Sequence, residues 1–249
     1  MSSASAETIT CWYPPAWKTK TEKAEEIVAA LSDKSGLNIV PRIARNYPEI
    51  LRAFSTTEPN IVYVGSFVQA IIKARGLGTA LVQNVNGREF YSGVLVYPKG
   101  EDPEDILRTY PSEIAFARGA SSGESSALAA TGGKALIATP NHGATCAAVK
   151  AGKAKAGVVK NWWWDSRKDD FPMLAMYRMP GISIEKNPDN VLTVSNAISA
   201  SEAEKIKDAA IASKEVFGAK EMVPFDQSLL QFSLELMVKG RLDPLTYSW

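Results

Sequence analysis

The stretch NIVYVGSFVQAIIKA, residues 60–74, indicates the fold class of this chain. Asn60 to Val64 is a short apolar run rich in β-branched residues, which is typical of a buried strand. Gly65 and Ser66 interrupt this run, and the residues from Phe67 to Ala74 then favour a helix. A strand that passes through a small-residue turn directly into a helix is the repeating unit of an α/β fold.

The chain before this stretch shows the same alternation. Residues 9–13 and 37–43 predict strands, and residues 47–54 predict a short helix. Residues 21–31 have apolar side chains at helical spacing, and Gly36 follows as a stop signal. Three strands that alternate with three helices predict a parallel sheet.

A second α/β block follows. It has predicted strands at 113–117 and 157–159 and predicted helices at 122–130 and from about 145 to 152, and residues 101–105 are expected to form an acidic loop. The β-rich runs 91–97 and 190–195 bracket this block, and predicted helices 202–216 and 227–239 close the chain.

We therefore expect two α/β lobes that are joined by two hinge strands, with a ligand cleft between the lobes. Residues 7–92 and 194–249 are expected to form lobe one, and residues 93–193 lobe two. Residues 1–6 are expected to be a disordered tail or the remnant of a signal. A boundary made of strands favours hinge motion over independent domains.

Composition and charge narrow the function classes. The formal net charge is +1, with 45% hydrophobic and 22% charged residues, which argues against nucleic acid or an anionic membrane as the partner. No apolar run approaches the roughly 20 residues that span a bilayer. Cys11 and Cys146 lack metal-site spacing and are expected to be small buried residues, so no metal or other cofactor is expected.

Ala4-Ser5-Ala6 fits the small-residue site at which a signal peptide is cut. No charged and apolar segment precedes it. We expect either that the signal peptide itself is missing from this sequence or that these residues are a plain small-residue tail.

The stretch RGASSGES, residues 118–125, contains the G-x-S-x-G pattern of a hydrolase nucleophile, with Ser121 at its centre. A serine nucleophile needs a base and an orienting acid. His142 is the single histidine, and Glu124 is the only acid between it and Ser121. This spacing leaves no room for the strands that normally carry both partners, so we do not expect an enzyme.

The same stretch is better explained as the start of a helix that binds an anion. Ser121 and Ser122 are good capping residues, and Gly123 permits close approach of a ligand to the backbone. The unpaired N–H groups of a helix start attract phosphate-like or carboxylate groups. Ordinary helix capping is the alternative. The turns at Gly65-Ser66 and 141–145 are similar, and all three are expected beyond the carboxyl ends of strands.

Five segments resemble the phosphonate/phosphite-type family of ABC-transporter solute-binding proteins, which have the type II periplasmic binding fold. They are the stretch 60–74 and, in order, YSGVLVYPKGED (91–102), IAFARGASSGESSALAA (114–130), NHGATCAAVKAGKAKAGVVKNWWWD (141–165) and VLTVSNAISASEAEKIKDA (191–209). The resemblance covers residues 7–240. It implies export to the periplasm or another extracytoplasmic location, a membrane permease as partner, a small anionic ligand and no catalysis.

The resemblance also implies ligand-binding residues. These are Ser121, Ser122 and Gly123 in the oxyanion cradle, His142 before the next helix, and Tyr47, Gly65, Ser66 and Tyr91. Two departures concern the ligand. Ala120 stands where the family often has a hydroxyl, and Lys160-Asn161 stand where it often has an acid, so an aminoalkyl-phosphonate is not assumed.

Aromatic and basic residues near the predicted loop mouths complete the expected site. Tyr13 and Trp17 in lobe one, and Asn161 and Trp162 in lobe two, are expected to contact ligand, with core packing as the alternative for the rings. Arg45, Arg118 and Lys160 are candidate counter-charges. Two alternatives stay open: a betaine-like or heterocyclic ligand stacked by aromatic rings, and a module that senses ligand for a kinase or chemoreceptor.

Overall fold

The computed structural model describes residues 7–119 and 122–248, and of Ser122 the backbone alone. The chain divides into two compact units. Unit 1 takes the described residues up to Glu89 and Pro188–Ser228, and unit 2 takes Phe90–Asn187 and the described residues from Leu229 onward. Each unit has its own α/β sheet, which confirms the prediction of two α/β lobes.

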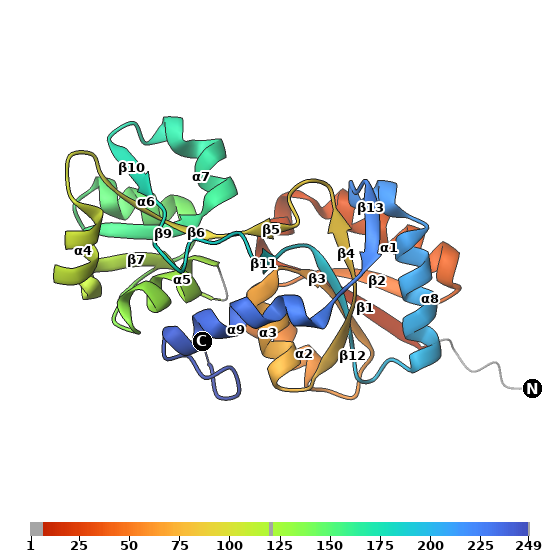
Figure 1. Ribbon diagram of the computed structural model, residues 1–249. Coiled ribbons are helices and arrows are strands. Elements are labelled where there is room, and N and C mark those ends of the chain that lie inside the picture. Colours follow the sequence, from red (N-terminus) through yellow and green to blue (C-terminus); the bar gives the residue numbers. More distant parts are fainter. Residues whose placement is uncertain (1–6, 120–121, 249) are drawn as a thin grey trace, which may run out of the picture. The chain divides into compact units, whose positions relative to one another are not determined.

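Unit 1 contains a six-stranded sheet in the order β13-β4-β12-β3-β1-β2 (Figure 1). The strands are β1 (Thr8–Tyr13), β2 (Asn38–Ile43), β3 (Asn60–Val64), β4 (Gly78–Val85), β12 (Val191–Ser195) and β13 (Glu221–Pro224). β1 pairs in parallel with β2 and β3, as predicted. β12 runs antiparallel to β3 and β4, and β13 antiparallel to β4, so the whole sheet is mixed. Pro41 is accommodated because β2 is an edge strand.

The helices of unit 1 lie on both faces of this sheet. They are α1 (Thr21–Ser35), α2 (Tyr47–Phe54), α3 (Ser66–Ala74) and α8 (Ala200–Ile211), with the short 3-10 helices η1 (Pro15–Thr19), η4 (Lys214–Phe217) and η5 (Gln227–Leu230). α1 and α8 share one buried cluster with alternate residues of β1. α2 and α3 stay outside that cluster and pack against β3, β4 and β12. Gly36 ends α1 in the left-handed conformation at φ 71°, as its position predicts.

Unit 2 contains a five-stranded sheet in the order β10-β6-β9-β7-β8. The strands are β6 (Gly93–Pro98), β7 (Ile114–Ala117), β8 (Ile137–Thr139), β9 (Ala156–Lys160) and β10 (Leu174–Tyr177). β7 pairs in parallel with both β8 and β9, whereas β6 and β10 are antiparallel additions. The carboxyl ends of β9, β7 and β8 therefore meet at one edge of the sheet.

Side chains that alternate along the strands fill two cores in unit 2. Its helices are α4 (Pro103–Thr109), α5 (Ser122–Thr131), α6 (His142–Lys150), α7 (Asn161–Arg167) and α9 (Gln231–Lys239), with the short helices η2 (Pro111–Glu113) and η3 (Lys168–Asp170). Leu95 and Phe116 pack under α4, α5 and α9. Val94 and Ala115 point to the opposite face and pack under α6 and α7.

Two expectations need correction. Residues 101–105 are not all loop, because Asp102 accepts the backbone N–H of Glu104 at 2.9 Å and thereby caps α4. The C-terminal segment was assigned to lobe one, but the chain from Leu229 onward belongs to unit 2, where α9 packs on α5. This packing requires Gly240, since a Cβ atom there would lie 2.9 Å from Cβ of Leu128.

The chain passes between the units after residues 89, 187 and 228. At the first two passages, β5 (Phe90–Tyr91) and β11 (Asn187–Pro188) form a two-stranded sheet. The runs predicted to cross, 91–97 and 190–195, instead lie mostly within the two sheets, as β6 of unit 2 and β12 of unit 1. The predicted boundaries of lobe two at residues 93 and 193 are therefore wrong, because unit 2 begins at Phe90 and the chain returns to unit 1 at Pro188. The third passage, which leads into α9, was not predicted.

Candidate functional site

Three helices of unit 2 begin at the edge where β7, β8 and β9 end. Gly123 lies in the first turn of α5, His142 is the first residue of α6, and Asn161 is the first residue of α7. Ala117 is in register with Thr139, and Phe116 with Val158, so these strand ends are neighbours. Ser121 lies outside the described residues, as does the side chain of Ser122, so their predicted contacts stay predictions.

The start of α6 carries the imidazole of His142, one nitrogen of which is not bonded by any described residue. Asn141 caps the helix by accepting the N–H of Ala144 at 2.9 Å, so His142 does not serve as the cap. Nδ1 of His142 is buried and has no hydrogen-bond partner among the described residues. Burial, and then the positive charge of Lys160, lower the pKa of His142 to about 4. The imidazole is therefore neutral at physiological pH.

Lys160 brings a positive charge to the same edge. Its Nζ lies 4.4 Å from the ring centroid of Tyr91 and 4.5 Å from that of Trp162. The two rings meet edge to face, with centroids 6.1 Å apart. Cation–π attraction to both rings stabilises the ammonium group in this position. The charge of Lys160 is also the second cause of the lowered pKa of His142, at the start of α6.

Asn161 has a structural role that was not predicted. Its Oδ1 accepts the N–H of Ser92 at 3.1 Å, and its Nδ2 donates to Glu185 at 3.2 Å. Its own N–H donates to the carbonyl of Ser92 at 3.0 Å. The buried amide thus ties α7 to the residue before β6, which favours a role in holding unit 2 together over ligand contact.

The other two tryptophans of this segment differ in burial. Trp164 is buried in the core below α6 and α7. Trp163 is half-buried, and its ring centroid lies 5.7 Å from that of His142. Trp162 and Trp163 are therefore the rings of this segment that lie near Lys160 and His142, at the strand-end edge of the unit 2 sheet.

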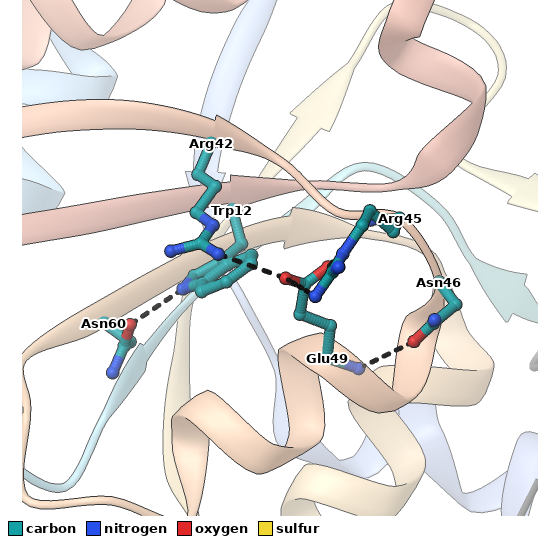
Figure 2. Close-up of polar contacts among 6 residues, drawn as sticks. All are labelled: Trp12, Arg42, Arg45, Asn46, Glu49 and Asn60. Atoms are coloured by element: carbon teal, nitrogen blue, oxygen red, sulfur yellow. Dashed lines mark hydrogen bonds and ion pairs between the residues drawn. The ribbon is translucent and has the colours of Figure 1, made fainter.

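The corresponding edge of unit 1 is organised around a carboxylate, as Figure 2 shows. Glu49, in α2, accepts the backbone N–H of Arg45 at 2.8 Å and pairs with the guanidinium groups of Arg45 and Arg42 at 3.2 and 3.1 Å. The bond from the Arg45 backbone, helped by both arginine charges, lowers the pKa of Glu49. Asn46 caps α2 by accepting the Glu49 N–H at 3.1 Å.

Arg42 and Arg45 both form ion pairs with Glu49. The guanidinium carbon of Arg42 lies 4.6 Å from the ring centroid of Trp12, whose Nε1 donates to Asn60 at 2.7 Å (Figure 2). Arg45 was predicted as a candidate counter-charge for the ligand. Its guanidinium group instead pairs with Glu49, and this ion pair holds the segment that leads into α2. Arg118, another candidate, is exposed, and its backbone N–H donates to Thr139 at 2.9 Å.

Tyr47 follows this cap as the first residue of α2 and is half-buried. Burial, and then the negative charge of Asp189, raise the pKa of Tyr47 to about 12. The same carboxylate acts on the pKa of Tyr63. Asp189 was not predicted as a site residue; its position between a crossing segment and β12 is the signal that could have found it.

Tyr13 is a core residue, in contrast to its predicted ligand contact. It is fully buried, and its ring stacks on that of Trp17 with centroids 4.7 Å apart. Trp17 is half-buried and meets the ring of Tyr63 edge to face at 5.8 Å. These contacts favour core packing for Tyr13, with Trp17 at its margin.

The remaining predicted positions lie at the start of α3. Gly65 precedes the helix in an extended conformation, and Ser66 is its first residue and is buried.

Cys11 and Cys146 are buried and unpaired, as expected, and burial raises the pKa of each to about 12.

The described residues contain neither a membrane-spanning helix nor a metal-binding cluster. No helix in this part of the chain is long and apolar enough to cross a membrane. No group of three or more His, Cys, Asp or Glu side chains in it is arranged to hold a metal ion.

The model of one protein family matches residues 17–223, which is most of the chain. Its description is the periplasmic substrate-binding protein of phosphonate ABC transporters. The chain belongs to this family. Members are binding components of transporters, which implies a small-molecule ligand and a permease partner. No protein in a search of curated sequences matches.

Solved structures with low sequence identity share the fold of this family member. PhnD1 from Prochlorococcus marinus, in complex with methylphosphonate, is 15% identical at a TM-score of 0.68, over 95% of this chain and 99% of that one. A Xanthomonas citri protein bound to ATP is 10% identical at a TM-score of 0.73, over 94% and 97%. A phosphonate-transporter component from Pseudomonas aeruginosa is 14% identical at 0.67, over 94% and 87%. The fold is that of type II periplasmic binding proteins.

Proposed function

We propose that this chain is an extracytoplasmic solute-binding protein that captures a small oxyanion of the phosphonate, phosphite or phosphate kind and delivers it to an ABC permease. The family supports a transported small molecule. The observation that supports an anion is Lys160, whose ammonium group is held between Tyr91 and Trp162 at the edge where α5 and α6 begin.

Binding in this proposal uses the backbone as well as the lysine. The first N–H groups of α5 and α6 carry partial positive charge and favour a phosphonate-like group. Ser121 and Ser122 add hydroxyl donors at the start of α5. The neutral imidazole of His142 adds a further polar group, and its Nδ1 has no competing partner among the described residues.

Capture then proceeds by hinge closure at the crossing segments 89–90 and 187–188. Closure removes water from the anion and adds contacts from unit 1, such as Tyr47 and the start of α3. A closed state is favoured only by contacts that the open state lacks. The permease would recognise the closed, liganded protein.

Lys160 also restricts the class of anion. An ammonium group on the ligand would be repelled by the lysine at this edge. The proposed ligand is therefore an oxyanion without a cationic group, and an aminoalkyl-phosphonate should bind more weakly.

A second candidate ligand is an organic zwitterion, such as a betaine-like metabolite. The observation that favours it is the carboxylate of Asp189, whose negative charge contributes to the raised pKa of Tyr47 and of Tyr63 in unit 1. Such a ligand would place its cationic group in unit 1 and its carboxylate in unit 2.

Thermal shift and calorimetry with methylphosphonate, phosphite, phosphate, methanesulfonate, acetate, 2-aminoethylphosphonate and glycine betaine separate these ligands. Ligand at 100 times its Kd should stabilise the fold by about 2.7 kcal/mol. We expect methylphosphonate, phosphite or phosphate to do so, and 2-aminoethylphosphonate to do so less. Stabilisation by glycine betaine and by no free anion would replace the first candidate with the second, and no response to any anion overturns the oxyanion proposal.

Transport and sensing are separated by the neighbouring genes. A permease gene and an ATPase gene beside this one would support delivery to a transporter. A histidine-kinase gene in their place would favour a sensing module.

A further inference from the structure

The C-terminal segment lies along α5, the helix whose first turn is the proposed oxyanion cradle. α9 packs on α5, and Gly240 brings the backbone so close that an added Cβ would lie 3.0 Å from the backbone nitrogen of Ala129. The chain after Gly240 then reaches Glu124, in the first turn of α5. The C-terminal segment therefore contacts the first turn of α5, at Glu124, and the second half of that helix, at Leu128 and Ala129.

Residues 243–247 form a compact turn that presents Tyr247. The carboxylate of Asp243 accepts the N–H of Leu245 at 2.9 Å and the hydroxyl of Thr246 at 3.0 Å. The carbonyl of Asp243 accepts the N–H of Tyr247 at 2.8 Å. The phenol of Tyr247 donates to Oε1 of Glu124 at 2.5 Å.

Glu124 links Tyr247 to Gly119, a residue that precedes α5. Its side chain is buried, and its second oxygen, Oε2, accepts the N–H of Gly119 at 2.9 Å. Gly119 has φ 92°, a left-handed conformation that favours glycine. One carboxylate thus bonds both the C-terminal turn and the chain just before the cradle.

The charge of Glu124 makes this arrangement relevant to binding. A carboxylate in the first turn of α5 opposes an anion there unless its charge is directed to other donors. Tyr247 and Gly119 supply those donors, and Arg118 is close enough to influence the pKa of Tyr247. Burial and Glu124 raise that pKa, so the phenol remains a proton donor at physiological pH.

We propose that Tyr247 is a positioning residue for anion binding: through Glu124 it fixes Gly119 and the first turn of α5 in the geometry that accepts an oxyanion. This inference rests on the proposed function. It gives the C-terminal turn a role in ligand affinity in addition to stability.

The test compares Tyr247→Phe with the wild type by calorimetry with methylphosphonate and with phosphate. We expect a Kd about tenfold weaker, because one hydrogen bond to a charged group is lost. Tyr177→Phe is the matched control, since it removes a tyrosine-to-glutamate bond of 2.6 Å, to Glu104, elsewhere in unit 2. Its Kd should equal that of the wild type, even if both variants unfold at lower denaturant.

Glu124→Gln gives a readout that a purely structural role would not move. If Glu124 acts only as a repelling charge, this variant binds the anion more tightly, and that result overturns the inference. If Glu124 positions the cradle, it binds more weakly, and adding Tyr247→Phe weakens binding little further because the two groups act together. Amide exchange of Gly119 should also become faster in Tyr247→Phe.

The failures are distinguishable. A wild-type protein that binds neither anion overturns the proposed function and this inference with it. A wild type that binds, with an unchanged Kd in Tyr247→Phe, overturns the positioning role of Tyr247 alone.

Discussion

The two sheets carry opposite chemistry at the edges where their parallel strands end. In unit 1, the carboxylate of Glu49 is enclosed by a backbone N–H and two guanidinium groups (Figure 2). In unit 2, the ammonium group of Lys160 sits over aromatic rings, and a buried imidazole nitrogen of His142 has no partner in the described part of the chain.

This difference is the basis on which we propose that the unit 1 cluster is scaffold and the unit 2 edge is the binding site. Buried polar atoms are usually hydrogen-bonded, so an exception needs an explanation such as a ligand. The Glu49 cluster is satisfied internally and holds the start of α2 in place. The edge of unit 2 offers the positive charge of Lys160 and a polar atom of His142 that no described residue bonds, and both suit an anion.

Reversing the charge of Lys160, at the edge of unit 2, should have the largest effect on anion affinity. Lys160→Glu places a carboxylate beside the starts of α5 and α6, so we expect methylphosphonate or phosphate affinity to fall by about 2–5 kcal/mol, which is thirtyfold or more. Calorimetry measures this. Lys155→Glu is the control, because Lys155 also lies over a tyrosine ring of unit 2, that of Tyr110, at 5.0 Å. Equal affinities in the two variants would contradict the anion site.

Breaking the unit 1 cluster should reduce stability instead of affinity. Glu49→Ala leaves the backbone N–H of Arg45 and two guanidinium groups without their acceptor, and we expect the free energy of unfolding to fall by about 2–3 kcal/mol. Urea unfolding measures this. Glu25→Ala, at an exposed position of α1, is the control and should change it by less than about 0.5 kcal/mol. An anion affinity that fell as far as in Lys160→Glu would remove the distinction between scaffold and site.

The contribution of Glu49 also depends on pH. Its pKa is lowered in the folded state from an ordinary value of 4.5, so its stabilisation is fully present above that pH. It is lost as the pH falls through the lower folded-state pKa. We therefore expect the stability difference between wild type and Glu49→Gln to shrink on acidification below pH 4.5, and a difference that grew there would contradict the assignment.

The sequence predicted what local patterns determine. The strand-to-helix stretch at 60–74, the stop at Gly36 and the helix at 47–54 all appear where expected, because strand pattern, glycine and helical spacing act within a few residues. The family resemblance also held. The strands β4 and β13 were missed, since their pairing partners are distant in the sequence.

The site was predicted less completely because side-chain partners come from tertiary contacts. Tyr13 carries an aromatic ring suited to ligand stacking, but β1 turns that ring into the core. Asn161 stands at a helix start, but Ser92 and Glu185 occupy its amide. The C-terminal helix was assigned to the wrong lobe because helical spacing does not reveal which sheet a helix covers.

Removing the imidazole of His142 should reduce anion affinity less than reversing the charge of Lys160 does. His142→Ala deletes one polar contact to the anion, and we expect affinity to fall by about 1–1.5 kcal/mol, or roughly tenfold. Ser213→Ala is the matched control, because the buried hydroxyl of Ser213 in unit 1 also has no partner among the described residues. If both variants bind alike, an unpartnered buried atom does not mark the ligand site in this protein.

The smallest effect is the shift that Lys160 imposes on His142. Burial is the larger cause of the lowered pKa of His142 and Lys160 the smaller, so Lys160→Met should raise that pKa from about 4 but leave it below the ordinary 6.5. The chain has one histidine, so its imidazole signals in an NMR titration are unambiguous.

The shift connects the edge of unit 2 to stability. A folded-state pKa below the unfolded value means that the unfolded chain takes up a proton first as the pH falls, so the stability cost of His142 grows from about pH 6.5 down to pH 4 and stays at its full value below that. Lys160→Met should reduce that cost, whereas Lys155→Met should leave the titration unchanged. A signal that moves equally in both variants would show that general charge, and not the ammonium group held by Tyr91 and Trp162, acts on His142.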